Sequence, residues 1–300
     1  MRAEKLLQRI EESLVVDQGA KYRGLLKKAS LELTDAFDVK EQHFRGHLGA
    51  SLLGRECDRA LWYTFHWWTK NRFDGRMIML FNRGHLEEAR FVAMLQTAGV
   101  QVWQHDANGK QIRVQGHRGH GGGSTDGVVR GVPDFPDIPM VAEFKTHSEK
   151  SFNKLRDEGM QHAKWEHFVQ TQIYAGRLRL TKILYLAVNK NNDEPYAEII
   201  DFDPVIFARY EEREKRIIDT EEIPPRFRDN PKWTPCRFCD HVGKCFNNEP
   251  PERNCRTCAC VAFLDDGKVG CKRDLLFGPI APRSLEEQMA GCQNGYVMKQ

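Results

Sequence analysis

Two charged residues interrupt a short apolar stretch, and this pattern constrains the fold more than any other part of the sequence. Residues 140–146 read MVAEFKT, which is the composition of a short buried strand except for Glu143 and Lys145. Because side chains alternate across a strand, these two share one face, and Ala142 and Phe144 share the other. A carboxylate and an ammonium that are buried together lose hydration energy unless something there uses them. The sequence therefore predicts a strand with one apolar and one functional face.

A second carboxylate is expected beside this polar face. Residues 125–130 are typical of a strand that opens with Asp126, and residues 133–139 are rich in proline and aspartate, as turns are. A hairpin through this turn would bring Asp126 beside Glu143, so that two carboxylates and Lys145 converge at one end of a sheet. Asp134 is the weaker candidate, because it lies next to the turn and only nine residues before Glu143.

Composition and charge restrict the class of protein. Charged residues make up 29% of the chain and aromatic residues 10%, as in a folded soluble protein. The net charge of +3 is nearly neutral, so a surface that binds nucleic acid would have to be local. No apolar run approaches the roughly 18 residues of a membrane span, and the acidic N-terminal segment does not resemble a signal peptide. We expect a cytoplasmic protein without a membrane partner.

Hydrophobic periodicity predicts helices and strands in alternation. Helices are expected over residues 1–16, 80–98, 148–158, 165–178 and 204–220, and strands over residues 100–103, 112–115, 182–189 and 196–201. Ser51 is a plausible N-cap of a further helix that runs through Cys57 and Trp62, and the aromatic residues 62–68 are expected in the core. His117 and His120 are expected to be exposed loop residues.

The predicted fold is α/β, with a mixed central β-sheet flanked by helices. A helical N-terminal segment (1–46) precedes a core (47–246), and a cysteine-rich C-terminal metal-binding segment (247–300) follows. In the helix over residues 80–98, Glu88 recurs at the spacing of the apolar face, an unusual place for a carboxylate. Glu87 and His85 are the competing candidates for a functional residue on this helix.

The joint pattern resembles the PD-(D/E)XK nuclease superfamily, and more closely its RecB-like exonucleases and the related CRISPR-associated and phage nucleases. Asp126 and Glu143-x-Lys145 match the core motif, and Gly84 and Glu88 match a helix that offers one more metal ligand. The RecB-like pattern Q-x-x-x-Y is matched by Gln170 and Tyr174, which lie four apart on one helix face. The resemblance covers roughly residues 47–246.

This resemblance implies a Mg²⁺-dependent deoxyribonuclease that also accepts Mn²⁺. It favours an exonuclease that acts on DNA ends or single strands over an endonuclease. Asp126, Glu143 and Glu88 would bind the metal, and Lys145 would orient or deprotonate the attacking water. Gln170 and Tyr174 would reach toward the scissile region or a phosphate. The setting would be recombination, repair or phage DNA metabolism, with DNA and a recombination, annealing or helicase protein as partners. The alternative is a non-catalytic zinc or iron–sulfur protein that binds nucleic acid or serves as a scaffold in a helicase–nuclease complex.

Nine cysteines without a secretion signal favour metal ligands over disulfides. Family members with a 4Fe–4S cluster use one cysteine plus three, and the matching residues here are Cys57, Cys236, Cys239 and Cys245. A Cys₄ zinc site is the alternative for this set. A second set is compatible with a structural zinc ion, and consists of Cys255, Cys258, Cys271 and Cys292. Cys260 is then a spare thiol or replaces Cys258.

Overall fold

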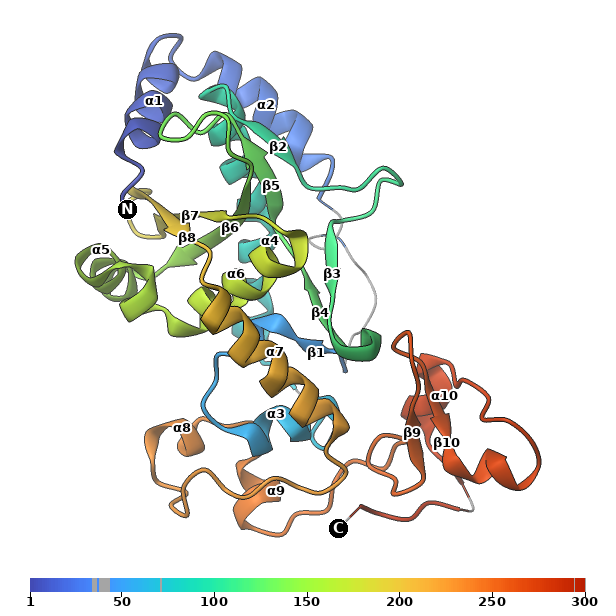
Figure 1. Cartoon of the computed structure of the whole chain (residues 1–300). Coiled ribbons are helices and arrows are strands. Elements are labelled where there is room, and N and C mark those ends of the chain that lie inside the picture. Colours follow the sequence, from blue (N-terminus) through green and yellow to red (C-terminus); the bar gives the residue numbers. More distant parts are fainter. Residues whose placement is uncertain (34–36, 38–43, 71, 294, 300) are drawn as a thin grey trace. The chain divides into compact units, whose positions relative to one another are not determined.

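The computed structural model describes residues 1–33, 37, 44–70, 72–293 and 295–299, and it divides into two compact units (Figure 1). Unit 1 comprises residues 1–40, 73–114 and 124–207, and unit 2 comprises residues 41–72, 115–123 and 208–300. Each unit is thus assembled from segments that are not consecutive in the sequence. The division into segments 1–46, 47–246 and 247–300 stays a prediction.

A five-stranded mixed sheet forms the centre of unit 1. Its strands, in spatial order, are β2 (Gln101–Trp103), β5 (Gly127–Arg130), β6 (Met140–His147), β7 (Lys182–Asn189) and β8 (Pro195–Asp201). β6 and β7 are parallel, and the other neighbours are antiparallel. Alternation and β-branched content predict these strands because such side chains fit a pleated, half-buried surface.

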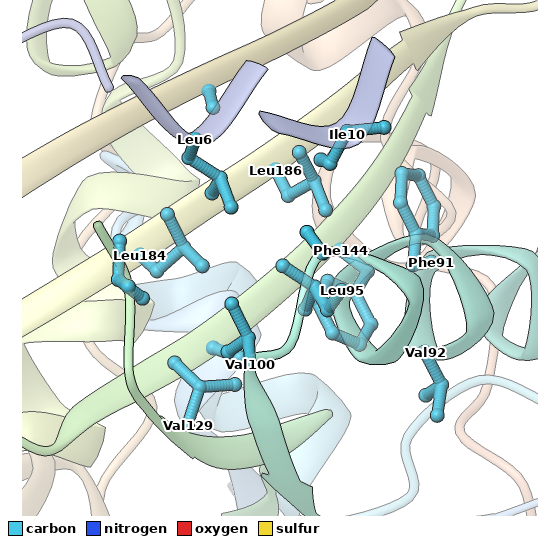
Figure 2. Packing of buried hydrophobic residues seen from close by; sticks show 14 of the residues in the cluster. Leu6, Ile10, Phe91, Val92, Leu95, Val100, Val129, Phe144, Leu184 and Leu186 are labelled. Carbon is cyan, nitrogen blue, oxygen red and sulfur yellow. The ribbon is translucent and has the colours of Figure 1, made fainter. Parts of the chain in front are cut away.

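Helices cover both faces of this sheet, which confirms the predicted α/β fold. The helices of unit 1 are α1 (Glu4–Val15), α2 (Ala20–Ser30), α4 (Gly75–Thr97), α5 (Glu149–Ala163) and α6 (Trp165–Leu178). Leu6 and Ile10 of α1 and Phe91 and Leu95 of α4 share one core cluster with Phe144 of β6 (Figure 2). The rings of Phe91 and Phe144 are stacked with centroids 5.1 Å apart.

The opposite face of the sheet packs against α5 and α6. Phe152 and Leu155 of α5 and Phe168 of α6 form a second cluster with Tyr185 of β7 and Tyr196 of β8. Consecutive residues of β6 and β7 thus alternate between two cores. The polar residues Glu143 and Lys145 alternate with Phe144, so they lie on the side of α5 and α6, as the period of two predicts.

Unit 2 contains short elements that connect longer loops. Its elements are β1 (Leu48–Gly49), the 3₁₀ helices η2 (Ala50–Leu52), η3 (His117–Gly119) and η4 (Lys272–Leu276), α3 (Asp58–Phe65), α8 (Thr234–Arg237), α9 (Val242–Phe246), β9 (Val261–Phe263), β10 (Val269–Cys271) and α10 (Leu285–Ala290). Three further elements cross the boundaries between the units, namely β3 (Arg113–Gln115), β4 (Gly121–Ser124) and α7 (Pro204–Asp219).

Two expectations about unit 2 were wrong. Ser51 does not begin a long helix, because it lies in η2, and α3 starts only at Asp58 with Cys57 as its N-cap residue. His120 is fully buried, since its Nε2 atom lies 2.6 Å from the Leu264 carbonyl oxygen and its ring packs against Phe263. The aromatic residues 62, 63, 65, 67 and 68 are buried in the core, as predicted.

Gly121 marks a close approach in unit 2. The buried side chain of Glu214, on α7, lies directly against it, and a β-carbon at this position would overlap the Glu214 carboxyl group. Glu214 Oε1 in turn accepts a hydrogen bond from the His117 backbone N–H at 2.8 Å. Only glycine fits at position 121, because any larger residue would clash with the Glu214 side chain. In the described part of the chain, no helix has the length and apolarity needed to cross a membrane.

Candidate active site

The hairpin of β5 and β6 brings two carboxylates together. Gly127 pairs with Ala142, so Asp126, one residue before β5, lies opposite Glu143. The Asp126 carboxylate accepts a hydrogen bond from the Phe144 backbone N–H, with an N···O distance of 2.6 Å. The expected convergence of Asp126 and Glu143 is thus present, and a main-chain donor fixes the Asp126 side chain.

Lys145 completes this group. Its ammonium forms an ion pair with Glu143 Oε1 and lies 3.9 Å from Asp126 Oδ2. It also donates a hydrogen bond to the Phe144 carbonyl oxygen at 3.1 Å. The Glu143 side chain has no exposed surface, whereas that of Lys145 is 28% exposed. The site is therefore buried at Glu143 and opens toward solvent at Lys145.

Burial and mutual repulsion disfavour the charged forms of the two carboxyl groups, and Lys145 favours them. Burial raises the pKa of Asp126 to about 8, the charges of Glu143 and Glu88 add to this rise, and Lys145 opposes it. Burial likewise raises the pKa of Glu143, against the charge of Lys145. Burial alone would lower the pKa of Lys145, but the charges of Glu143 and Asp126 outweigh it and raise the pKa above its ordinary value. An additional cation would be stabilised here.

Glu143 is the residue of this group whose surroundings most favour a bound cation. By hydrogen-bond geometry neither of its buried carboxylate oxygens has a partner among the described residues. Burial raises its pKa, and the Lys145 ammonium and the Gln170 amide oppose this rise. Mg²⁺ is commonly held by one or two carboxylates, with water completing the octahedron. The oxygens of Asp126, Glu143 and the Phe144 carbonyl suit this chemistry. Across the described residues, no three His, Cys, Asp or Glu side chains converge as a ready metal cage.

Helix α4 supplies a third carboxylate near this pair. Glu88 is the residue whose charge raises the pKa of both Asp126 and Glu143. Its Oε1 atom lies 3.7 Å from His85 Nδ1. Glu87, not Glu88, occupies the buried face of the helix, where it pairs with Arg90 at 2.9 Å. Glu88 is half-buried, with 24% of its side chain exposed, and the choice among Glu88, Glu87 and His85 as the ligand from this helix stays a prediction.

Gln170 and Tyr174 both lie buried on α6, four residues apart. The Gln170 amide donates a hydrogen bond to the Tyr174 hydroxyl at 3.3 Å. Burial raises the pKa of Tyr174, and the charge of Glu143 contributes. Both side chains therefore adjoin the Glu143–Lys145 group. Asp134 does not join it, because its carboxylate accepts from the Leu6 backbone N–H at the start of α1.

The four cysteines of the one-plus-three set line a single pocket in unit 2. Cys57, Cys236, Cys239 and Cys245 share its wall with Arg59, Tyr63 and His241. Arg59 Nη1 lies 3.7 Å from Cys245 Sγ. Burial raises the pKa of Cys236 and of Cys239, and the neighbouring Cys57 adds to both shifts. Both ring nitrogens of His241 are hydrogen-bonded to threonine hydroxyls, so this histidine is not available as a ligand in this arrangement.

The second cysteine set surrounds the β9–β10 hairpin. Cys255 and Cys258 precede β9, and Cys271 ends β10 opposite Val261. Cys258 Sγ accepts from two backbone N–H groups at 3.5 Å, those of Cys260 and Val297. Burial raises the pKa of Cys255, and the charges of Cys258, Cys271 and Cys292 contribute. The sulfurs of the other three cysteines thus lie within electrostatic reach of Cys255.

Three residues beside the site were not singled out from the sequence. His147 follows Lys145 on the same face of β6, His167 precedes Gln170 by one helical turn on α6, and Tyr185 is the register partner of Glu143 on β7. The Tyr185 hydroxyl lies 2.9 Å from a ring nitrogen of each histidine. One feature of the sequence could have indicated His147: it continues the alternation of Glu143 and Lys145, and therefore shares their face of the strand.

No protein-family model and no curated protein matches this chain. Among solved structures, it is similar to two crystal structures of LHK-Exo, an alkaline exonuclease from Laribacter hongkongensis, one of them in complex with dAMP. Both are 14% identical over 58% of this chain and 86% of theirs, with TM-scores of 0.39 and 0.40. A crystal structure of SSO0001 is 18% identical over 75% of this chain and 96% of that one, with a TM-score of 0.33. The geometry of the site, and not these likenesses, supports the proposals below.

Proposed function

We propose that this protein is a metal-dependent nuclease that hydrolyses phosphodiester bonds of DNA. The observation that carries the proposal is the fully buried Glu143 carboxylate, whose oxygens make no hydrogen bond of good geometry and whose counter-charge, Lys145, is shared with Asp126. Burial of an unsatisfied charge is costly, and binding of a divalent cation would remove that cost. A site that combines two carboxylates, a lysine and buried amide groups suits hydrolysis of an anionic ester.

Each side chain has a role in this proposal. A bound Mg²⁺ would supply charge neutralisation and an acidified water. Asp126 and Glu143 would hold it, and Glu88, whose charge acts on both carboxyl groups, would be a further ligand. Lys145 keeps its proton, because the carboxylates raise its pKa, and so acts here as a fixed positive charge that orients the water and the phosphate. This differs from a role as the base that removes the proton.

The proposed substrate is a DNA end or single strand, in recombination, repair or phage DNA metabolism. A DNA strand could reach the site from solvent at Lys145, whose side chain is partly exposed. The Glu143 side chain is not exposed to solvent. The proposed protein partner is a recombination, annealing or helicase protein. Mn²⁺ is expected to replace Mg²⁺, since both prefer carboxylate and water ligands.

The test is digestion of linear and covalently closed DNA by the wild type and by Lys145→Ala, with Mg²⁺, Mn²⁺ or EDTA. We expect metal-dependent loss of linear DNA that disappears in the variant. Lys182→Ala is the matched control, because Lys182 pairs with Asp201 at the far end of β7. Cleavage of closed circles would assign an endonuclease instead. Folded protein that cleaves nothing, or equal cleavage by Lys145→Ala, would refute the proposal and favour the non-catalytic DNA-binding alternative.

We further propose that Cys57, Cys236, Cys239 and Cys245 hold a 4Fe–4S cluster. Support comes from the four thiols that line one pocket although Cys57 lies far from the others in sequence. Protein purified without oxygen is expected to be brown and to contain iron, and Cys239→Ala is expected to lose both iron and solubility. A colourless protein with stoichiometric zinc would replace the cluster by a Cys₄ zinc site.

The second cysteine set is proposed to bind a structural zinc ion. The N–H···S hydrogen bonds to Cys258 and to Cys292 favour the thiolate form that zinc requires. Cys271→Ala is expected to lose one zinc per chain by elemental analysis, whereas Cys260→Ala is expected to keep it. Equal zinc content in both variants would refute this assignment.

A further inference from the structure

The polar surface around Glu143 extends beyond the residues that the proposed reaction uses. On β6, Glu143, Lys145 and His147 occupy successive positions of one face, and on α6, Tyr174, Gln170 and His167 form a facing row. The two rows run in opposite directions, so Gln170 adjoins Glu143 and the His167 ring stacks on His147, with centroids 5.9 Å apart. Contacts between a sheet and a helix are usually apolar. The histidine end of these rows has no role in the proposed reaction.

A continuous chain of hydrogen bonds runs through this end. Lys164 Nζ donates to Ser151 Oγ, which lies 3.3 Å from His147 Nδ1. His147 Nε2 lies 2.9 Å from the Tyr185 hydroxyl, and this hydroxyl lies 2.9 Å from His167 Nδ1. Tyr185 is fully buried, whereas His167, Ser151 and Lys164 are partly exposed. The chain thus leads from the surface through a buried tyrosine and back to a partly exposed histidine.

Burial favours the neutral form of both imidazoles. Burial, together with the charges of Lys164, Lys145 and Lys190, lowers the pKa of His147 to about 4. Burial and the charges of Lys145 and Lys164 lower the pKa of His167 to about 2. A neutral imidazole has one N–H donor and one acceptor nitrogen, so each ring must accept a hydrogen bond on one side and donate on the other.

The direction of the chain follows from its ammonium end. Lys164 can only donate, so the Ser151 oxygen accepts from it, and the Ser151 hydroxyl is free to donate to His147 Nδ1. His147 Nε2–H then donates to Tyr185, and the Tyr185 hydroxyl donates to His167 Nδ1. Chains in which each group both accepts and donates strengthen cooperatively. In this arrangement, His167 presents its Nε2–H, on the ring edge opposite Tyr185, as a donor.

We propose that His167 binds a phosphate oxygen of the DNA strand through its Nε2–H group, one phosphodiester away from the bond that is cleaved. His147, Tyr185 and Ser151 are positioning residues, which hold the ring and its tautomer. This inference rests on the proposed function for its substrate. The ammonium groups of Lys145 and Lys164 both act on the His167 ring, since their charges lower its pKa after burial, and they would also attract an anionic oxygen.

The spacing along β6 supports a neighbouring phosphodiester. Two residues of a strand span about 6.5 Å, so His147 lies about this far along β6 from Lys145, and the His167 ring stacks on His147 with centroids 5.9 Å apart. Lys145 faces the reacting group in the proposed reaction. A donor displaced by this distance is placed for the next phosphate along the strand. It would fix the path of the DNA through the site.

The test measures DNA binding in EDTA, where cleavage does not interfere, by fluorescence anisotropy with single-stranded oligonucleotides. Each oligonucleotide carries one uncharged methylphosphonate at a different position. We expect wild-type affinity to fall about 10- to 100-fold at one position, the size of a hydrogen bond to a charged group. His167→Phe is expected to lose the same factor on unmodified DNA and to show no further loss at that position. His167→Asn, which can still donate, is expected to recover part of the affinity.

Two further variants separate contact from packing. Tyr185→Phe keeps the ring but breaks the hydrogen-bond chain. In this variant, the methylphosphonate at the same position is expected to reduce DNA affinity by a smaller factor than in the wild type. Tyr196→Phe is the matched control, because this buried hydroxyl donates to Glu198 outside the chain, and it is expected to bind like the wild type. The proposal would be overturned if the dependence of DNA affinity on methylphosphonate position (the methylphosphonate profile) were the same in His167→Phe as in the wild type.

Failure of this inference is distinguishable from failure of the proposed function. Wild-type protein that shows the His167-dependent profile but cleaves no DNA would refute the nuclease and leave the phosphate contact standing. Protein that cleaves DNA with a profile independent of His167 would leave the nuclease and refute the contact. Protein that binds no DNA would refute both.

Discussion

Replacement of Glu143 by glutamine is expected to stabilise the metal-free fold while it abolishes cleavage. The wild-type carboxylate is fully buried, and neither oxygen has a hydrogen-bond partner of good geometry among the described residues. A buried polar atom without a partner costs about 1–3 kcal/mol, and a charged one costs more. Glutamine removes the charge and adds an amide donor for Asp126. Lys145 keeps Asp126 as its counter-charge at 3.9 Å.

The expected gain is about 1–3 kcal/mol, which corresponds to an increase of about 2–12 °C in Tm for a unit of this size. The gain should grow with pH. Burial raises the pKa of Glu143, so the folded state keeps a proton at pH values where the unfolded chain has lost it. Stability of the wild type therefore falls as the pH rises from the unfolded pKa through the folded pKa, and the variant lacks this loss.

Magnesium is expected to reverse the order of stability. A ligand at 1,000 times its Kd stabilises the folded state by about 4.1 kcal/mol, which exceeds the gain expected for the variant, and only the wild type should show this shift. Calorimetric unfolding in EDTA and in Mg²⁺ measures both effects. Glu198→Gln is the matched control, because that carboxylate accepts hydrogen bonds from Met160 N–H at 2.8 Å and from the Tyr196 hydroxyl at 2.6 Å. It should be destabilised by about 1 kcal/mol.

A lower Tm for Glu143→Gln in EDTA would refute this reasoning. It would mean that the ion pair between Glu143 and Lys145 is worth more than the cost of the unsatisfied carboxylate. An equal Mg²⁺ shift in wild type and variant would show that the cation binds elsewhere.

Three further outcomes follow from contacts described above. Gly121→Ala should destabilise unit 2 by at least about 1–3 kcal/mol, because the new methyl group overlaps the buried Glu214 carboxyl, and urea unfolding would measure this. Phe144→Ala should cost about 3–5 kcal/mol through loss of packing against Phe91, also by urea unfolding. Stability should fall as the pH drops from 6.5 to about 4, because burial lowers the pKa of His120 to about 4 and the unfolded chain alone takes up the proton. His120→Phe should flatten that part of a plot of unfolding free energy against pH.

The sequence predicted most of the sheet and helices of unit 1 because local periodicity determines them. The strand over Met140–His147 and the helix over Trp165–Leu178 follow from the spacing of apolar residues alone. The pairing of Asp126 with Glu143 was also within reach, since a hairpin is a local structure. The fold class was confirmed for the same reason.

The direction of single side chains was harder to predict from the sequence than the helices and strands. Glu87 and Glu88 are adjacent, and a helix turns by about 100° per residue, so the apolar periodicity alone does not decide which of the two is more buried. Ser51 has the chemistry of an N-cap but lies in a 3₁₀ turn. The contacts of Tyr185 with His147 and His167 join three elements, and no pattern in a single segment predicts such an encounter.

The interleaved segments of the two units set the order in which the protein can be completed. The chain passes between the units after residues 40, 72, 114, 123 and 207. During synthesis the first 40 residues must therefore wait for residues up to 207 before unit 1 can close, and unit 2 closes later still. Neither unit can be released as one continuous fragment by cutting between them. To separate the candidate active site from the cysteine pocket, segments would have to be rejoined in a new order. A change that prevents one unit from folding is therefore expected to impair folding of the other unit during synthesis.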